Sequence, residues 1–365
     1  MNSHRQTTAA EHYATFFDHR FLLQGLALYE SLQRHHPGSW LWVLCLDREV
    51  ERQLERLQLP RLRPLSLREL ETPELRDAKR NRSRVDYIFT LTPFVYDFVF
   101  REDAAIDRLT YVDADVYFFR SPVPLLAEME AADRSIQLTE HGFSPEFRHL
   151  AEEFGRFCVQ FLSMRRDEAS ARVLRRWREQ CLETCTTAVN QRSQFFGDQK
   201  YLNDWPEQYP DFIHICRAQA EMLGPWNVDY YQALSDKPYL PVFYHFHSFR
   251  IFSRNWVQLS TGFNPRSAFH LYKEYFHALH RQDRRLKDHG IPRPHVPFAN
   301  DRIWLPRLLW RWLTGRANVR RFNAWREPAA STAPKPGGGF RPAHGEASAL
   351  LKNETAAGES RAAGV

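Results

Sequence analysis

The chain has 365 residues, of which 43% are hydrophobic, so it can bury a large core in one large α/β domain or in two smaller ones. Its formal net charge is +6, and its five cysteines show neither a paired metal spacing nor a disulfide framework. We therefore expect buried thiols and a cytoplasmic location. The polar segment 1–11 predicts no signal peptide, and no apolar run is long enough to predict a membrane span.

The first sixty residues alternate between strand and helix patterns. In chain order they predict a strand at His12–Phe17, a helix over Leu22–Leu32, a strand buried on both faces at Trp40–Leu46 and a charged amphipathic helix at Arg48–Leu59. This order predicts an α/β fold with a mostly parallel sheet flanked by helices. In such folds ligands bind at the carboxyl ends of the strands.

Further elements follow along the chain. They are a strand at Leu62–Leu67, a charged helix at Arg68–Lys79, a buried helix at Val85–Phe100 that is kinked or started at Pro93, strands at Ser135–Thr139 and Phe157–Met164, and a helix at Arg166–Glu183.

The apolar and aromatic run Leu109–Phe119 is broken by two acids, Asp113 and Asp115. In an extended chain these two side chains point to the same side, where buried carboxylates repel each other and are costly to desolvate. A divalent cation relieves both problems, and Mg²⁺ or Mn²⁺ prefers carboxylates together with substrate phosphates. Because the apolar run continues to Phe119, we favour a metal site on an extended segment. The alternative is a strand that ends at Val112, followed by two solvated turn aspartates.

A third ligand is expected from the segment Val242–Phe249, which places His245 and His247 on one side of an extended chain. Neutral imidazole is a good ligand for Mn²⁺, so a histidine here can join the two aspartates around one ion. The alternative is a histidine that is hydrogen-bonded in the core.

Asp198 and Gln199 follow Gly197 at an expected helix start. Either they present polar groups to a polyol such as a sugar, or Asp198 is simply the N-cap of the helix. Trp226 and Asn227 form a further turn that offers an aromatic wall and a polar contact.

Four cations crowd the segment Lys79–Arg84. Such a run is either a solvated face or a source of charge that holds a diphosphate leaving group.

The pattern changes from about Arg281. Residues 302–326 contain seven arginines, no acids and four of the ten tryptophans, whereas residues 327–365 have the composition of a disordered tail. As a helix, Pro306–Thr314 carries arginines on a narrow side and Trp and Leu elsewhere. This pattern is typical of a helix at an anionic membrane surface or of one packed on the main domain. No recognised nucleic-acid-binding module accompanies the charge, so nucleic acid is not expected as a partner.

Five ordered signatures between about Tyr13 and Phe252 resemble those of family 8-type retaining glycosyltransferases. They are Phe17-Asp18-His19-Arg20-Phe21, Asn81-Arg82-Ser83-Arg84, Tyr111-Val-Asp-Ala-Asp115, Phe196-Gly-Asp-Gln-Lys-Tyr-Leu202 and Tyr244-His-Phe-His247. The resemblance implies a single GT-A-type domain at 1–280 that binds a nucleotide sugar. A basic Trp- and Arg-rich extension would follow at 281–326 and a tail at 327–365.

The same resemblance implies roles for the individual residues. Asp113 and Asp115 would hold a Mn²⁺ (or Mg²⁺) that bridges the diphosphate of a nucleotide sugar, with UDP as the expected nucleotide. The third ligand falls on His245, and His247 is its rival. The remaining expected contacts are Asp18 and Phe21 with the base or ribose, Arg82 and Arg84 with the diphosphate, Asn227 with the donor, and Asp198 and Gln199 with the donor sugar near its anomeric carbon.

The chain departs from the family in one strand. Cys158 and Gln160 replace a donor-facing amide and a small residue, a change that bears on the donor sugar.

The expected activity is metal-dependent transfer of a hexose from a nucleoside diphosphate to a hydroxyl acceptor on a glycan or lipid-linked saccharide, with retention of configuration. Gln199 would lie beside the oxocarbenium-like anomeric carbon, Asp198 would orient the sugar, and the leaving phosphate would accept the acceptor's proton. One alternative is a non-catalytic peripheral membrane protein that binds nucleotide sugars. Another is a sugar nucleotidyltransferase, which normally has a Gly-rich basic loop where this chain has Asp18-His19-Arg20. Residues 302–326 would place the protein on the cytoplasmic membrane face.

Overall fold

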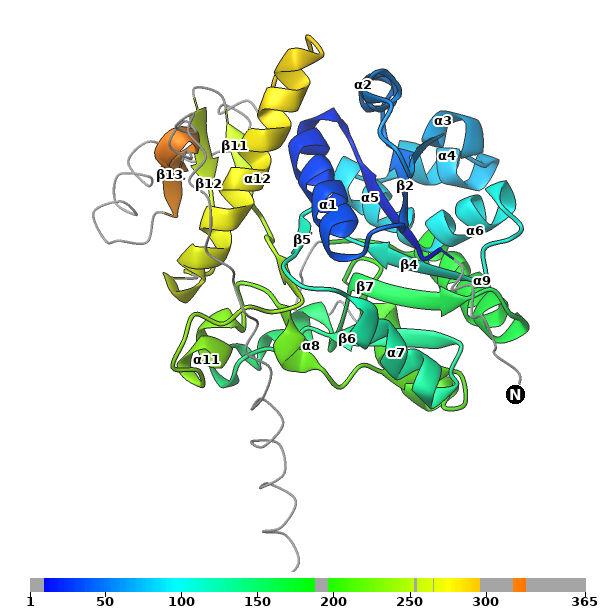
Figure 1. Ribbon diagram of the computed structural model, residues 1–365. Coiled ribbons are helices and arrows are strands. Elements are labelled where there is room, and N and C mark those ends of the chain that lie inside the picture. Colours follow the sequence, from blue (N-terminus) through cyan, green and yellow to red (C-terminus); the bar gives the residue numbers. More distant parts are fainter. Residues whose placement is uncertain (1–9, 188–195, 253–254, 265, 296–317, 326–365) are drawn as a thin grey trace, which may run out of the picture. The chain divides into compact units, whose positions relative to one another are not determined.

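The computed structural model describes residues 10–187, 196–252, 255–264, 266–295 and 318–325 (Figure 1). The chain divides into two units, Met1–Arg326 and Glu327–Val365, and every described residue belongs to the first. The predicted membrane-surface helix Pro306–Thr314 and the predicted tail 327–365 lie outside the described residues. Within the described ranges, no helix combines the length and the apolar character needed to cross a membrane.

The strands are β1 His12–Phe17, β2 Trp40–Cys45, β3 Leu62–Ser66, β4 Arg108–Val112, β5 Val116–Phe118, β6 Ile136–Glu140, β7 Phe157–Arg165, β8 Ile213–Ile215, β9 Met222–Leu223, β10 Phe243–His245, β11 Arg250–Phe252, β12 Trp256–Gln258 and β13 Val319–Arg321.

The α-helices are α1 Leu22–His35, α2 Arg48–Leu57, α3 Leu67–Leu70, α4 Pro73–Asn81, α5 Arg84–Thr90, α6 Thr92–Glu102, α7 Val123–Ala132, α8 Leu150–Phe154, α9 Glu168–Glu183, α10 Trp205–Gln208, α11 Val228–Ala233 and α12 Phe269–Asp288. Short 3-10 helices include η1 His19–Phe21 and η3 Lys200–Asp204.

The central sheet of the described chain has seven strands in the order β3-β2-β1-β4-β7-β6-β8. Strands β3, β2, β1 and β4 are parallel to one another, β7 is antiparallel to both β4 and β6, and β8 is parallel to β6. Within this sheet, β7 is therefore the strand that runs against the others. The predicted α/β class with a mostly parallel sheet flanked by helices is confirmed.

Both faces of the sheet are buried, which is why its central strands are almost continuously apolar. In β2, Leu41 and Val43 belong to one hydrophobic cluster, whereas Trp42 and Leu44 belong to the other. Helices α1 and α12, which lie side by side, contribute to the first cluster, and α6 and α9 contribute to the second (Figure 1).

Two predicted helices are each divided in two. The charged segment Arg68–Lys79 forms α3 and α4, and Val85–Phe100 forms α5 and α6 with a break at Leu91. Pro93 lies in the first turn of α6, where the missing N–H of proline has no helical partner to lose. Of the two predicted alternatives at Pro93, a kink or a helix start, the structure shows a start, one residue earlier at Thr92.

Leu109–Phe119 is not one extended segment, so that prediction is wrong. Strand β4 ends at Val112, a turn follows, and β5 begins at Val116 in a separate sheet of order β5-β10-β9. The turn is closed by the Val116 N–H, which donates to the Asp113 carbonyl at 3.1 Å. The apolar residues continue past the turn because β5 is itself buried, so composition does not mark the break.

A third sheet, β11-β12-β13, joins distant parts of the described chain. Strand β13, at Val319–Arg321, pairs antiparallel with β12. Helix α12 runs from Phe269 to Asp288, through the expected domain boundary at residue 280, and its Leu271 and Leu279 are buried in the main core.

Candidate functional site

Asp113 and Asp115 flank the turn that carries the chain from the central sheet to the β5-β10-β9 sheet. The Asp113 N–H donates to the Gln160 carbonyl of β7 at 3.4 Å, and the Phe246 N–H donates to the Asp115 carbonyl at 2.8 Å. These bonds tie the turn to a different strand on each side. The two carboxylates are mostly buried, with 22% and 15% of their side-chain surface exposed. They are not the solvated turn aspartates of the alternative interpretation.

His245 ends strand β10 and faces both carboxylates. Strand β10 pairs antiparallel with β5, and the register sets His245 opposite Val116, the residue after Asp115. The Nε2 atom of His245 lies 3.1 Å from Asp115 Oδ1 and 3.7 Å from Asp113 Oδ2. Two acids and an imidazole from distant parts of the sequence therefore meet in one place.

Gln160 fixes the orientation of the imidazole. Its Oε1 lies 2.8 Å from His245 Nδ1, and because an amide oxygen can only accept, Nδ1 carries the proton. Nε2 is therefore the ring nitrogen directed at the acids. On the other side of the site, the Tyr111 hydroxyl donates to Asp113 Oδ1 at 3.0 Å.

A bulge in β7 marks the strand segment that contacts the site. Gln137 of β6 pairs with Ser163 of β7, and Thr139 pairs with Cys158. The two paired residues are two positions apart in β6 but five positions apart in β7, so β7 contains extra residues between them. The Thr139 hydroxyl donates to the carbonyls of Cys158 and Phe161, at 3.3 and 3.0 Å, and braces the extra residues. Bulges commonly redirect side chains beside functional sites, and this one includes Gln160.

The three titrating groups influence one another strongly. Burial raises the pKa of Asp113 to about 6, against the opposing effect of His245. Burial also acts to raise the pKa of Asp115, but His245 outweighs it and the pKa is lowered. Burial acts to lower the pKa of His245, but Asp115 outweighs it and holds the pKa well above its ordinary value. The site therefore has one more acidic group than its single imidazole can neutralise.

These residues fit a divalent cation. A metal-binding histidine commonly donates a hydrogen bond from its second ring N–H to an oxygen, as His245 does to Gln160 Oε1. Two carboxylates and a neutral imidazole form a ligand set suited to Mn²⁺. A cation would also neutralise the surplus negative charge that Asp113 brings.

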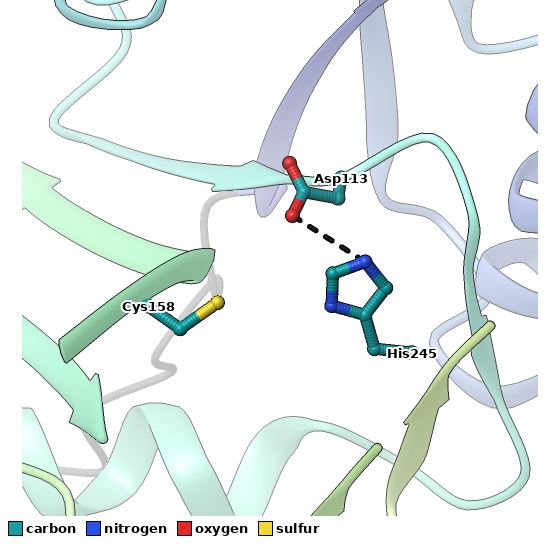
Figure 2. A group of neighbouring side chains, drawn as sticks. All are labelled: Asp113, Cys158 and His245. Atoms are coloured by element: carbon teal, nitrogen blue, oxygen red, sulfur yellow. Dashed lines mark ion pairs between the residues drawn. The ribbon is translucent and has the colours of Figure 1, made fainter. Parts of the chain in front are cut away.

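Cys158 is a fourth potential ligand at the same place. One potential ligand atom from each of Asp113, Cys158 and His245 lies within 4.8 Å of the other two. Figure 2 shows these side chains directed toward one common space from β7, from the end of β4 and from β10. The Cys158 side chain is buried and hydrogen-bonds to His245.

Asp198 and Gln199 lie on the turn that begins at Gly197, whose φ of +55° favours glycine. Asp198 is 1% exposed, and its Oδ2 has no hydrogen-bond partner among the described residues. Burial raises the pKa of Asp198 to about 7, and the charge of Asp113 adds to this effect. Gln199 donates from Nε2 to the Phe154 carbonyl at 2.8 Å and occupies the cap position of η3, so Asp198 is not the N-cap.

Asp18 and Arg84, two of the predicted cofactor contacts, form an ion pair. Asp18 follows β1 and caps η1 by accepting from the Arg20 N–H at 2.9 Å. Its Oδ2 lies 2.6 Å from Arg84 Nη2, and the Arg84 side chain is 56% exposed. Phe21 ends η1 and packs against the core cluster that contains α1.

Arg82 has a different setting. Its guanidinium donates to the Thr90 hydroxyl and to the carbonyls of Cys181, at 2.6 Å, and Leu182. The two carbonyls belong to the last turn of α9, so Arg82 caps that helix. Of the other cations in the basic run, Lys79 pairs with Glu71 and Arg80 with Asp77.

Trp226 forms an aromatic wall, and Asn227 supports the turn. The Trp226 ring stands edge-on to His245 and His247, with centroid distances of 5.5 and 5.8 Å. Asn227 is buried, accepts from the Gly224 N–H at 2.9 Å and donates to the His141 carbonyl at 3.1 Å. His247 lies beyond the end of β10 and is exposed.

Sequence reasoning treated Gln160 only as a departure from a family pattern and did not connect Tyr111 with Asp113. The available signal was polarity, because Cys158 and Gln160 lie two residues apart in the otherwise apolar first part of β7, residues 157–162. Their contact with His245 depends on the bulge and on β10, which local sequence does not show.

No family model matches the sequence. Two curated proteins of Bacillus subtilis (strain 168), both named as uncharacterized, are similar to it. YfnD is 28% identical over 249 residues, which cover 66% of this chain and 78% of that protein. YfnF is 29% identical over 260 residues, which cover 67% of this chain and 84% of that protein. Neither name assigns an activity.

Among solved structures, mouse xyloside xylosyltransferase 1 aligns with a TM-score of 0.42 at 15% identity, covering 65% of this chain and 97% of that chain. The apo-form glycosyltransferase GlyE of Streptococcus pneumoniae TIGR4 aligns with a TM-score of 0.43 at 15% identity, covering 68% of this chain and 55% of that chain. The galactosyltransferase LgtC aligns with a TM-score of 0.37 at 14% identity, covering 64% of this chain and 86% of that chain. Similarity at this level does not carry an activity over to this chain.

Proposed function

We propose that this protein is a metal-dependent glycosyltransferase of the hexosyltransferase type, with the GT-A fold. It moves a sugar from a nucleoside diphosphate, UDP in the first instance, to a hydroxyl acceptor and retains the anomeric configuration. The observation that carries the proposal is the convergence of Asp113, Asp115 and His245, together with the buried carboxyl group of Asp198, which is near enough for the charge of Asp113 to act on it and whose Oδ2 has no hydrogen-bond partner among the described residues. The first three suit a cation, and the fourth offers an acceptor to a sugar hydroxyl.

The location of the site supports a nucleotide donor. Strands β1 and β4 are parallel, so Asp18 and Asp113, which follow them, lie at the same edge of the sheet. Ligands of open α/β sheets bind at this edge. The Asp18–Arg84 pair offers a carboxylate for ribose hydroxyls and an exposed guanidinium for phosphate oxygens.

In this proposal, Asp113, Asp115 and His245 hold Mn²⁺ (or Mg²⁺). When bound, the ion supplies positive charge that stabilises the departing diphosphate. Asp198 accepts hydrogen bonds from the donor sugar and orients it. Gln199 places a polar, weakly nucleophilic amide beside the anomeric carbon, and the leaving phosphate accepts the proton of the attacking hydroxyl.

A saccharide or lipid-linked saccharide is the proposed acceptor. Within the predicted segment 302–326, Val319–Arg321 form β13, so the proposal falls on residues 302–317. They would hold the enzyme at an anionic membrane surface on the cytoplasmic side, because they combine four arginines with three tryptophans and no acids.

The test is release of nucleoside diphosphate from a panel of UDP- and GDP-sugars with and without Mn²⁺. Wild-type protein should release UDP from at least one donor in a Mn²⁺-dependent manner. Asp115→Asn should lower this rate by about a hundredfold or more, as loss of charge stabilisation in a transition state does. Asp133→Asn, a change at a side chain that is 91% exposed, should leave the rate unchanged.

Wild-type turnover by Asp115→Asn would refute the role of the acid pair. Nucleotide-sugar binding without release of UDP would favour the non-catalytic binding protein. Formation of a nucleotide sugar from a sugar phosphate and UTP would favour the nucleotidyltransferase.

A further inference from the structure

Cys158 is the one thiol that the described chain places among potential metal ligands. All five cysteines are buried and free of disulfides, so burial alone does not distinguish Cys158. Its distinction is that a ligand atom of Cys158 lies within 4.8 Å of ligand atoms of both Asp113 and His245 (Figure 2).

We propose that Cys158 is a sulfur ligand of the metal site, together with Asp113, Asp115 and His245. The inference rests on the proposed metal site and goes beyond it, because a thiolate changes which ion the site prefers. The resulting set of two carboxylate oxygens, one imidazole nitrogen and one sulfur favours a thiophilic ion such as Zn²⁺ or Co²⁺ over Mg²⁺.

The distances suit this assignment. In a tetrahedral zinc site the bonds are about 2.0 to 2.3 Å long, so two ligand atoms on one ion lie roughly 3.3 to 3.8 Å apart. The His245 Nε2 distances to Asp115 and Asp113, 3.1 and 3.7 Å, are close to this spacing. The ligand atoms of Cys158, Asp113 and His245 lie within 4.8 Å of one another, and in this proposal they move closer together when an ion binds.

The surroundings of the thiol support coordination. Gln160 Oε1 accepts a hydrogen bond from the Nδ1–H of His245, which leaves Nε2 for the ion. Gln160 Nε2 is itself buried and has no hydrogen-bond partner among the described residues, so the β7 segment also offers a free donor beside the site. A phosphate or sugar oxygen bound at the ion would satisfy that donor.

Coordination changes no oxidation state. The Sγ–H bond breaks, the proton leaves to solvent, and the sulfur lone pair binds the ion, as in other thiolate sites. Metal binding at this site should therefore release a proton.

The experiment is a titration of the full-length protein with Co²⁺, followed by absorption spectroscopy. The wild type should show both the visible d–d bands of bound cobalt and a near-ultraviolet sulfur-to-cobalt charge-transfer band. Cys158→Ser should keep the d–d bands and lose the charge-transfer band, and its Zn²⁺ affinity should fall by about tenfold or more. Its Mg²⁺ affinity should change little, because Mg²⁺ does not select sulfur.

Two controls make each outcome decisive. Cys216→Ser removes another buried thiol and should retain the full cobalt spectrum. Asp115→Asn should weaken all cobalt bands together. If Cys158→Ser does not fold, the wild-type spectrum alone decides whether sulfur is bound.

Cobalt d–d bands without a charge-transfer band in the wild type would overturn the sulfur assignment and leave the proposed metal site standing. A charge-transfer band that persists in Cys158→Ser would assign the sulfur to another cysteine. The absence of all cobalt bands would remove both the sulfur ligand and the proposed metal site.

Discussion

At the scale of single residues, Asp198 carries the clearest electrostatic signature. Its side chain is buried, Oδ2 has no hydrogen-bond partner in the described chain, and its pKa is raised to about 7 from an ordinary value of 3.8. Between these two values the folded protein binds a proton that the unfolded chain does not. The free energy of unfolding therefore falls as the pH rises through this window.

We predict that Asp198→Asn removes this loss. Between pH 5 and pH 8, the free energy of unfolding of the wild type should fall relative to that of the variant by roughly 3 kcal/mol, since each unit of pKa shift corresponds to about 1.4 kcal/mol. Urea denaturation at both pH values measures it, with Asp133→Asn as the exposed control. If the free energy of unfolding changed equally with pH in the wild type and in Asp198→Asn, the raised pKa of Asp198 would be contradicted.

At the scale of the elements, patterns that depend on neighbouring residues were predictable. Strand β1 was placed correctly at both ends, and β2 and α2 within two residues, because burial on both faces and a charged amphipathic stripe are visible in the sequence. The β4–β5 break and the β7 bulge were not predictable. Both depend on pairing with distant strands, and both occur inside apolar runs.

The role of Arg82 was also not predictable from local sequence, because its sequence neighbours indicate only a basic run. We predict that Arg82→Met lowers the free energy of unfolding by about 2 to 3 kcal/mol, since the Cys181 and Leu182 carbonyls at the end of α9 lose a charged donor. Arg80→Met, at a side chain that is 68% exposed, should cost less than about 0.5 kcal/mol. Equal effects of the two substitutions in urea denaturation would count against the cap.

A second measurement separates this role from the predicted diphosphate contact. If Arg82 acts as the cap of α9, Arg82→Met should leave the KM for the nucleotide sugar nearly unchanged under conditions where the variant is folded. A raised KM without loss of stability would assign Arg82 to the donor.

At the scale of the whole molecule, the site joins two sheets. Asp113 follows a strand of the central sheet, and His245 lies in the β5-β10-β9 sheet. We predict that Mn²⁺ at a hundred times its dissociation constant stabilises the folded protein by about 2.7 kcal/mol and raises Tm by several degrees. Calorimetry with and without EDTA measures the shift. The Asp115→Asn variant should not show this rise in Tm on addition of Mn²⁺. An equal rise in Tm for the wild type and the variant would mean that Mn²⁺ binds elsewhere.

The candidate site was predictable in composition but not in geometry. Asp113, Asp115 and His245 were named from residue type, and the structure brings them together. Their meeting depends on the antiparallel pairing of β5 with β10, two segments separated by more than a hundred residues, and no local pattern encodes that register.

The reversed direction of β7 has a consequence for how this protein can diversify. The other strands of the central sheet have their carboxyl ends at the edge where the site lies. Strand β7 runs the opposite way, so its amino-terminal part, with Cys158 and Gln160, lies at that edge. Substitutions at these two positions change the chemical hardness and the hydrogen bonding around the proposed ion and leave β1, β2 and β4 untouched. Related chains could thus change the ion preference of the proposed site by varying two side chains of one strand on an unchanged scaffold.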